Sequence, residues 1–143
     1  MEYTELPTVE VSFILSSRKI GTTEITDLIQ ISPTTERSID EWPDTIKNNT
    51  NLPEELKPRN EWSWTARFHK CMSVDEALAD LINQFQEKIT EIVEITERFS
   101  VEKSVTVLIH ANSNEMPEVG LESKAIEFLN CIKSPIYFDI YTY

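Results

Sequence analysis

The stretch Glu61-Trp62-Ser63-Trp64-Thr65-Ala66-Arg67-Phe68-His69 alternates apolar and polar residues. Successive side chains of a β-strand point to opposite faces, so Trp62, Trp64, Ala66 and Phe68 share one face. The other face carries hydroxyl, guanidinium and imidazole groups. A strand of this kind belongs to a sheet that packs its core on one side and meets water on the other. We therefore interpret both tryptophans as core residues rather than as an aromatic platform for a ligand.

Three other parts of the chain predict further strands. Residues 9–15 and 105–111 show the same two-residue alternation as the tryptophan stretch. The closing sequence IYFDIYTY, residues 136–143, predicts the last strand of the sheet. A weaker strand is expected near residues 37–42.

Three helices are predicted near residues 22–29, 73–99 and 121–132, where apolar residues recur at three- and four-residue spacing. The resulting order of elements is β-α-β-β-α-β-α-β. Its first six elements match the split βαβ plan. We therefore expect an α+β domain over residues 1–143, with helices packed mainly on one face of its sheet.

The long helix carries its own start signal. Ser73 and Glu76 have the spacing of a capping box, in which each side chain accepts a hydrogen bond from a free backbone amide of the first turn. From Ser73 the helix is expected to run to about Phe99, with a break near Thr90 or Thr96.

The charge balance limits the classes of partner. The chain has 25 acidic and 13 basic residues, which give a formal net charge of −12. Such a surface repels phosphate backbones, so we expect no nucleic-acid partner and favour a basic protein. The open alternative is that the acidity only keeps the protein in solution.

The start of the chain and its cysteines predict a cytoplasmic protein. The sequence MEYTELPTVEVSF lacks the basic and apolar regions of a signal peptide. Its apolar runs are far shorter than the ~20 residues of a membrane helix, so we expect no membrane partner. Cys71 and Cys131 have no short paired spacing, and we expect both thiols to be reduced and buried.

Several short motifs resemble the bacterial domain of unknown function 4279 family. Ile25-Thr26 with Leu28, followed by Ile31-Ser32-Pro33-Thr34, resembles the opening segment of that family. The tryptophan strand and Phe138-Asp139-Ile140-Tyr141 resemble its later landmarks. Members of the family carry a Gly-Asp pair after the Pro-Thr segment, whereas Thr35–Asp40 contains no glycine here. The resemblance implies a compact bacterial α+β domain without assigned catalytic residues.

Signatures of catalysis and of metal binding are missing from the sequence. His69, Cys71 and His110 do not have the paired spacing of a zinc site. No Gly-x-Ser-x-Gly nucleophile elbow occurs. Gly21 and Gly120 are the only glycines, too few for a phosphate-cradling loop. We therefore predict no catalytic residue, no metal site and no cofactor, and we do not favour an enzyme.

Two acidic segments are the candidate partner-binding regions. Glu87, Glu91 and Glu94 recur at helical spacing opposite the apolar stripe of the long helix. They form either a solvated outer face or a docking surface for a basic protein. The polar, proline-containing loop over about residues 33–60 places one aromatic residue among acids. These residues are Glu36, Asp40, Glu41, Trp42 and Asp44.

Trp42 has two alternative roles. An exposed tryptophan among acids suits a binding anchor. The alternative is that Trp42 folds back and plugs the edge of the core. Nothing in the sequence around Trp42 decides between the two.

The favoured hypothesis is a non-catalytic protein-binding domain, an acidic immunity protein that neutralises a basic toxin, such as a nuclease, by direct binding. A second hypothesis is a small enzyme or ligand-binding module with a pocket beside residues 34–60. A third is a homo-oligomer that pairs through the closing strand, which carries Tyr137, Tyr141 and Tyr143.

Overall fold

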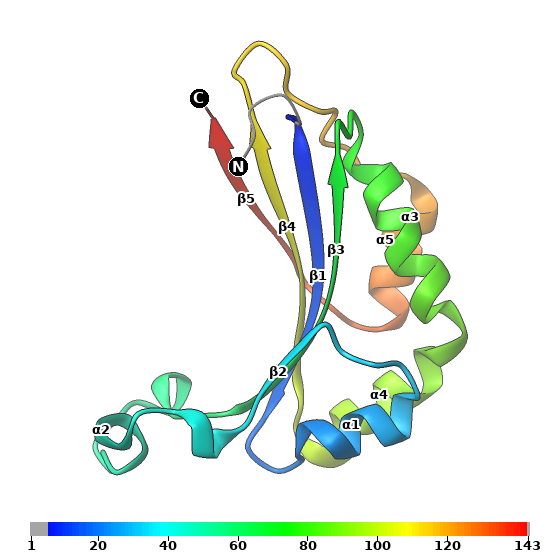
Figure 1. Ribbon diagram of the computed structural model, residues 1–143. Helices are drawn as coiled ribbons and strands as arrows, with labels where there is room; N and C mark the ends of the chain where they lie inside the picture. The colour runs from blue at the N-terminus through cyan, green and yellow to red at the C-terminus, as the bar shows by residue number, and fades with distance from the viewer. Residues whose placement is uncertain (1–5, 143) are drawn as a thin grey trace.

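The computed structural model describes residues 6–142 and contains a sheet with its long helices on one face (Figure 1). The tryptophan stretch lies on one of the central strands. The strands are β1 (Thr8–Ser17), β2 (Thr35–Arg37), β3 (Asn60–His69), β4 (Glu102–Ala111) and β5 (Ile136–Thr142).

Helices connect most of these strands. Within residues 6–142, no helix is long and apolar enough to cross a membrane. The helices are α1 (Thr22–Ile29), α2 (Asp44–Lys47), α3 (Val74–Phe85), α4 (Ile89–Phe99) and α5 (Ser123–Cys131), with short 3-10 segments η2 (Ile39–Glu41), η3 (Glu54–Leu56) and η4 (Gln86–Lys88).

The strand order in the sheet is β2-β3-β1-β4-β5. β1 pairs antiparallel with both β3 and β4, whereas β4 and β5 are parallel. β3 lies between β1 and β2, which α1 joins in sequence, as in a split βαβ unit. The predicted α+β class is confirmed. The observed order of elements adds the short helix α2 and divides the long helix into α3 and α4.

Aromatic side chains form the centre of the core between the sheet and α3. The ring of Phe85 lies 5.0 Å from that of Phe13 and 5.4 Å from that of Trp64, both in edge-on geometry. Trp62 is fully buried, and its Nε1 donates a hydrogen bond to Oγ1 of Thr26 at 3.0 Å. Burying an indole is favourable when its N–H keeps a partner. The interpretation as a core residue is confirmed for Trp62, whereas Trp64 is half-buried and packs against the edge of the core.

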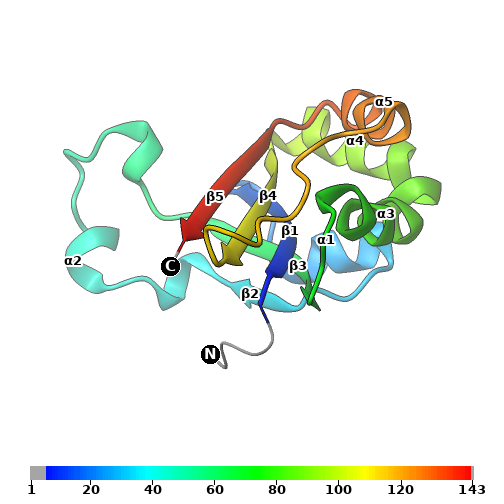
Figure 2. The same cartoon turned by 90° about the horizontal axis from the view of Figure 1, so that it is seen from above.

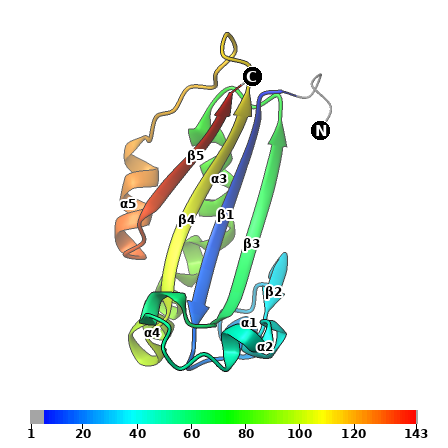
Figure 3. The same cartoon turned by 90° about the vertical axis from the view of Figure 1, so that its left-hand side faces the viewer.

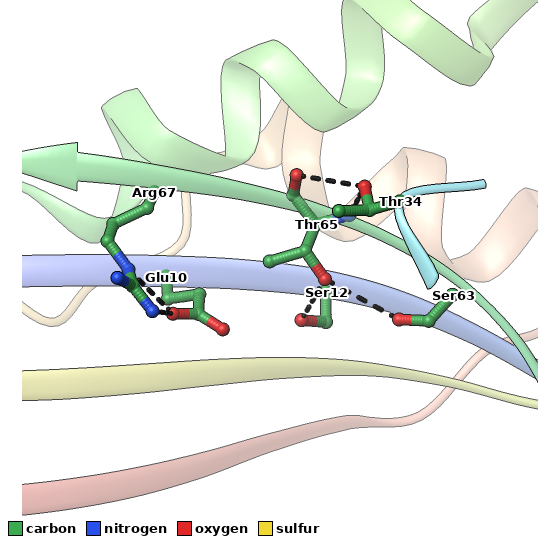
Figure 4. Close-up of polar contacts among 6 residues, drawn as sticks. All are labelled: Glu10, Ser12, Thr34, Ser63, Thr65 and Arg67. Atoms are coloured by element: carbon green, nitrogen blue, oxygen red, sulfur yellow. Dashed lines mark hydrogen bonds and ion pairs between the residues drawn. The ribbon is translucent and has the colours of Figure 1, made fainter. Parts of the chain in front are cut away.

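The opposite face of the sheet carries a row of polar side chains (Figure 4) and has no helix over its centre (Figure 3). Glu10 accepts hydrogen bonds on Oε2 from Nε and Nη2 of Arg67 at 2.9 and 2.6 Å. The hydroxyls of Ser12 and Thr65 lie 2.9 Å apart. Thr34 extends this network, since its Oγ1 accepts from the Thr65 amide at 2.8 Å. We call this surface the open face and the opposite one the covered face.

The long helix breaks just before Thr90, the first of the two places that the sequence suggested. The break is η4, Gln86–Lys88, and there is none at Thr96. α3 packs on the sheet whereas α4 packs against α1, so the axis must change where the packing partner changes. Thr96 lies inside α4, and its hydroxyl donates to the carbonyl of Ile92 at 2.8 Å.

The predicted capping box is also wrong. Ser73 occupies the N-cap position of α3 but makes no side-chain hydrogen bond to the first turn. The amide of Val74 donates instead to the carbonyl of Glu118 at 3.0 Å, and the Glu118 amide donates to Met72 at 2.8 Å. A distant segment therefore supplies an acceptor for the helix start, which the spacing of Ser73 and Glu76 could not reveal.

One of the two thiols is not buried as expected. Cys71 is buried, and its Sγ donates to the carbonyl of Ser73 at 3.1 Å. Cys131 is exposed at the end of α5. That helix packs against α3 through one side only, with Ala125 and Phe128 buried, so residues on its other side meet solvent.

The loop predicted over 33–60 leaves the body of the domain. The strand expected near residues 37–42 ends at Arg37, because Ile39–Glu41 forms a 3-10 turn. We call residues 38–59, which include α2, the excursion. None of its residues is fully buried. The excursion projects on the side of the open face, away from the other helices (Figures 1 and 2).

Candidate functional site

The candidate site is a groove between α1 and α4. α4 is amphipathic, with Ile92 and Ile95 buried. It packs against α1 near the lower end of the sheet (Figure 1). The groove has a volume of about 450 Å³. It is lined by Leu28 of α1 and by Glu94, Ile95, Glu97, Arg98 and Phe99 of α4.

The groove combines an apolar lining with carboxylates. Leu28 is 43% exposed, and Phe99 is half-buried. Glu94 and Glu97 are exposed, and Oε1 of Glu97 lies 3.4 Å from Nζ of Lys133. An apolar surface beside carboxylates suits a lysine or arginine side chain, because its methylene stem packs while its charged head stays near the acids.

Arg98 belongs to the same lining. Its guanidinium carbon lies 5.0 Å from the centroid of the Phe99 ring, a cation–π contact within the helix. Stacked there, Arg98 keeps part of the ring covered.

Glu91 lies closer to the core than the sequence suggested. Glu87, Glu91 and Glu94 were all expected on the outer face, and both Glu87 in η4 and Glu94 in α4 are exposed. Glu91 is half-buried, and its Oε2 is buried without a hydrogen-bond partner among the described residues. The reason is its position one turn before Ile95, at the edge of the buried stripe. A buried oxygen without a partner costs about 1–3 kcal/mol.

Trp42 is fixed within the excursion rather than free. Its Nε1 donates to the carbonyl of Arg59 at 3.0 Å, and the guanidinium carbon of Arg37 lies 4.0 Å from its ring centroid. The side chain is half-buried. It therefore neither plugs the sheet core nor stands out as a free anchor. It joins the two ends of the excursion.

The acids near Trp42 are all exposed. Glu36 lies on β2, and Asp40 and Glu41 lie in η2. Asp44 begins α2, and its Oδ1 lies 3.2 Å from Nζ of Lys47.

The structure does not bring the two acidic segments together. The excursion stands on the open-face side of the sheet, whereas α4 lies among the helices on the covered face (Figures 1 and 2). The eight residues predicted from sequence thus do not form one surface. Asp40, Glu41, Trp42 and Asp44 lie in the excursion, and Glu87, Glu91 and Glu94 lie on η4 and α4. Glu36 lies on β2, in register with Trp62 of the covered face. One partner that contacts both segments would have to reach around the edge of the sheet.

The residues weighed for metal binding lie at the upper end of the sheet. Among residues 6–142, no three His, Cys, Asp or Glu side chains are grouped to hold a metal ion. His110 stacks on Tyr141 of β5, with ring centroids 5.1 Å apart. Tyr137 and Tyr141 are exposed on this edge strand, while Tyr143 lies outside the described residues.

Sequence reasoning missed the apolar half of the groove. Leu28 fits the apolar spacing of its helix, and Phe99 ends the apolar stripe of α4. Both therefore read as core residues, and no local signal marks them as groove lining. Only the packing of α4 against α1 leaves them partly exposed beside Glu94.

Comparison with known proteins identifies a family but no characterised relative. The family described as Domain of unknown function (DUF4279) matches residues 7–143, nearly the whole chain. No curated protein and no solved structure shows a significant match.

Proposed function

The chain belongs to the DUF4279 family, whose description assigns no activity, and we propose that it is a non-catalytic protein-binding domain. In its sharpest form it is an acidic bacterial immunity protein that acts in the cytoplasm and neutralises a basic toxin by direct binding. The principal contact in this proposal is the groove between α1 and α4.

The composition of that groove is the observation that carries the proposal. Leu28 and Phe99 offer apolar surface, and Glu94 and Glu97 offer negative charge beside it. Tight interfaces combine a few apolar anchors with complementary charges that speed the encounter. The net charge of −12 means that the molecule as a whole also favours a basic partner.

Glu91 lies beside the same surface. It is half-buried one turn before Ile95 of the groove, and its negative charge adds to the charges of Glu94 and Glu97.

The experiment uses the product of the gene next to the one that encodes this chain, because an immunity gene is expected beside that of its toxin. We expect the neighbouring product to be toxic alone, and the two purified proteins to form a complex by calorimetry. Substituting Glu94→Lys should weaken that complex at least about tenfold, because a like charge would face the partner.

The matched control is Glu127→Lys, an exposed glutamate on α5 with the same change in net charge. The control should change the affinity by less than about threefold, because Glu127 lies outside the groove and its charge acts on the partner only at long range. A neighbouring product that is harmless or does not bind would contradict the proposal. Equal losses for the two variants would contradict the assignment of the groove.

A further inference from the structure

A second cavity lies within the excursion, on the other side of the sheet from the groove. Its volume is about 350 Å³, within the range of small-molecule sites. Arg18, in the turn after β1, contributes one wall and the excursion contributes the others. The lining residues are Arg18, Ile39, Ile46, Lys47, Asn49, Thr50, Lys57 and Pro58.

The lining carries three cations and no carboxylate, in a protein whose net charge is −12. The acids that pair with these cations lie outside the lining. Arg18 and Lys57 both pair with Glu54, the latter at 3.1 Å, and Lys47 lies 3.2 Å from Asp44. Glu54 and Asp44 are 58% and 84% exposed, so solvent weakens these pairs. The three cations can therefore turn toward an anion in the cavity.

Neutral donors and apolar side chains complete the lining. Oδ1 of Asn49 accepts a hydrogen bond from the Asn51 amide at 3.0 Å, which leaves the Nδ2 group as a donor. Ile39 and Ile46 are half-buried and line the same cavity. The lining thus offers positive charge for an anionic head and apolar surface for a short hydrocarbon body.

The walls of this cavity are held in place before any ligand binds. Oδ1 of Asn60 accepts from the Ile39 amide at 2.9 Å, and its Nδ2 donates to the carbonyl of Ile20 at 3.1 Å. One side chain therefore ties the excursion to the turn that carries Arg18. The bond from Trp42 to Arg59 lies beside this contact and also joins the start of the excursion to its end. Such preorganisation lowers the entropy that binding must overcome.

We propose that this cavity binds a small amphipathic organic anion, with a carboxylate or phosphate head held by Arg18, Lys47 and Lys57. The apolar body lies against Ile39 and Ile46. This binding is independent of the protein-binding function, because the groove and the cavity share no residue.

The test is a titration of the ¹⁵N-labelled full chain with phenyl phosphate, followed by backbone amide shifts. We expect saturable shifts at Ile46, Asn49 and Thr50. Phenyl phosphate should bind at least about tenfold more tightly than either phenol or inorganic phosphate, since only it engages both halves of the lining. Absence of saturable shifts at these amides, or equal affinity for phenol, would overturn the proposal.

Two variants locate the charge that matters. Lys57→Gln should weaken phenyl phosphate binding about three- to tenfold, because it removes one charge-assisted hydrogen bond. Lys47→Gln should act similarly and replaces the first variant if Lys57→Gln disturbs the dispersion of the spectrum. The control Lys124→Gln makes the same charge change on exposed α5 and should leave the affinity within about twofold. An equal loss in the control would show that only net charge matters, and the assignment would fail.

Discussion

The covered and open faces of one sheet are built from alternate residues of the same strands, yet only the covered face packs a hydrophobic core. On the covered face, Trp62 and Phe13 pack against Phe85 of α3. On the open face, Ser12 lies in register with Thr65 on one side and Thr106 on the other. Apolar burial stabilises far more than exposed hydroxyl contacts do. The fold therefore depends on the covered face, and the open face can change at little cost in stability.

The largest effect that sharpens this comparison is expected for Trp62→Ala. The substitution leaves a cavity in the fully buried aromatic cluster and removes the hydrogen bond to Thr26. It should lower the free energy of unfolding by about 3–5 kcal/mol, measured by urea unfolding. The matched change Thr65→Ala, on the open face of the same strand, should cost less than about 1.5 kcal/mol. Equal losses would refute the division of roles between the faces.

An intermediate effect is expected for Asn60→Ala. Asn60 begins β3, and its side chain bonds both the Ile39 amide and the Ile20 carbonyl. Its removal should cost about 1–3 kcal/mol, because both partners lose a hydrogen bond in a partly buried place. Hydrogen exchange of the Ile39 amide should become faster. Exchange in the aromatic core should change only as much as the loss in the free energy of global unfolding requires. Unchanged exchange at Ile39 would show that the excursion is held in another way.

A smaller, pH-dependent effect is expected from Lys103, the cation that pairs in register with Leu15 of the covered face. Burial lowers its pKa below 10.5, nearby Lys133 lowers it further, and Glu97 partly opposes the shift. Between the lowered folded pKa and 10.5 the unfolded chain binds more protons, so this residue makes stability rise with pH. Lys103→Met should remove that rise, measured as urea unfolding across a pH series. An identical pH slope in the variant would contradict the assignment.

The smallest effect is expected for Arg67→Ala on the open face. Arg67 is exposed, and although it donates twice to Glu10, exposed ion pairs contribute about 0–1 kcal/mol. Thermal unfolding should therefore shift only slightly, and less at high salt. A loss of stability comparable to that of Trp62→Ala would mean that the fold also depends on the open face.

Local sequence patterns predicted the elements whose formation depends mainly on residues close together in the sequence. The alternation in Glu61–His69 predicted β3 and the burial of Trp62, while Trp64 on the same face is half-buried. Helical spacing suggested a break near Thr90, but its exact position at Gln86–Lys88 follows from the packing of α4 against α1. The capping-box spacing failed at Ser73, because Glu118 from a later segment satisfies the helix start. Both features depend on contacts between residues far apart in the chain.

The sequence by itself determined the class of this domain and its acidity, because strand alternation, helical spacing and net charge are properties of short segments and of composition. Tertiary structure alone decided where the proposed binding surfaces arise. Leu28 meets Phe99 in the groove, and Arg18 meets Lys57 in the cavity. Each pair joins segments that are distant in sequence, so no local pattern records it. For the same reason, only the fold separated the acids of the excursion from those of α4, by placing the sheet between them.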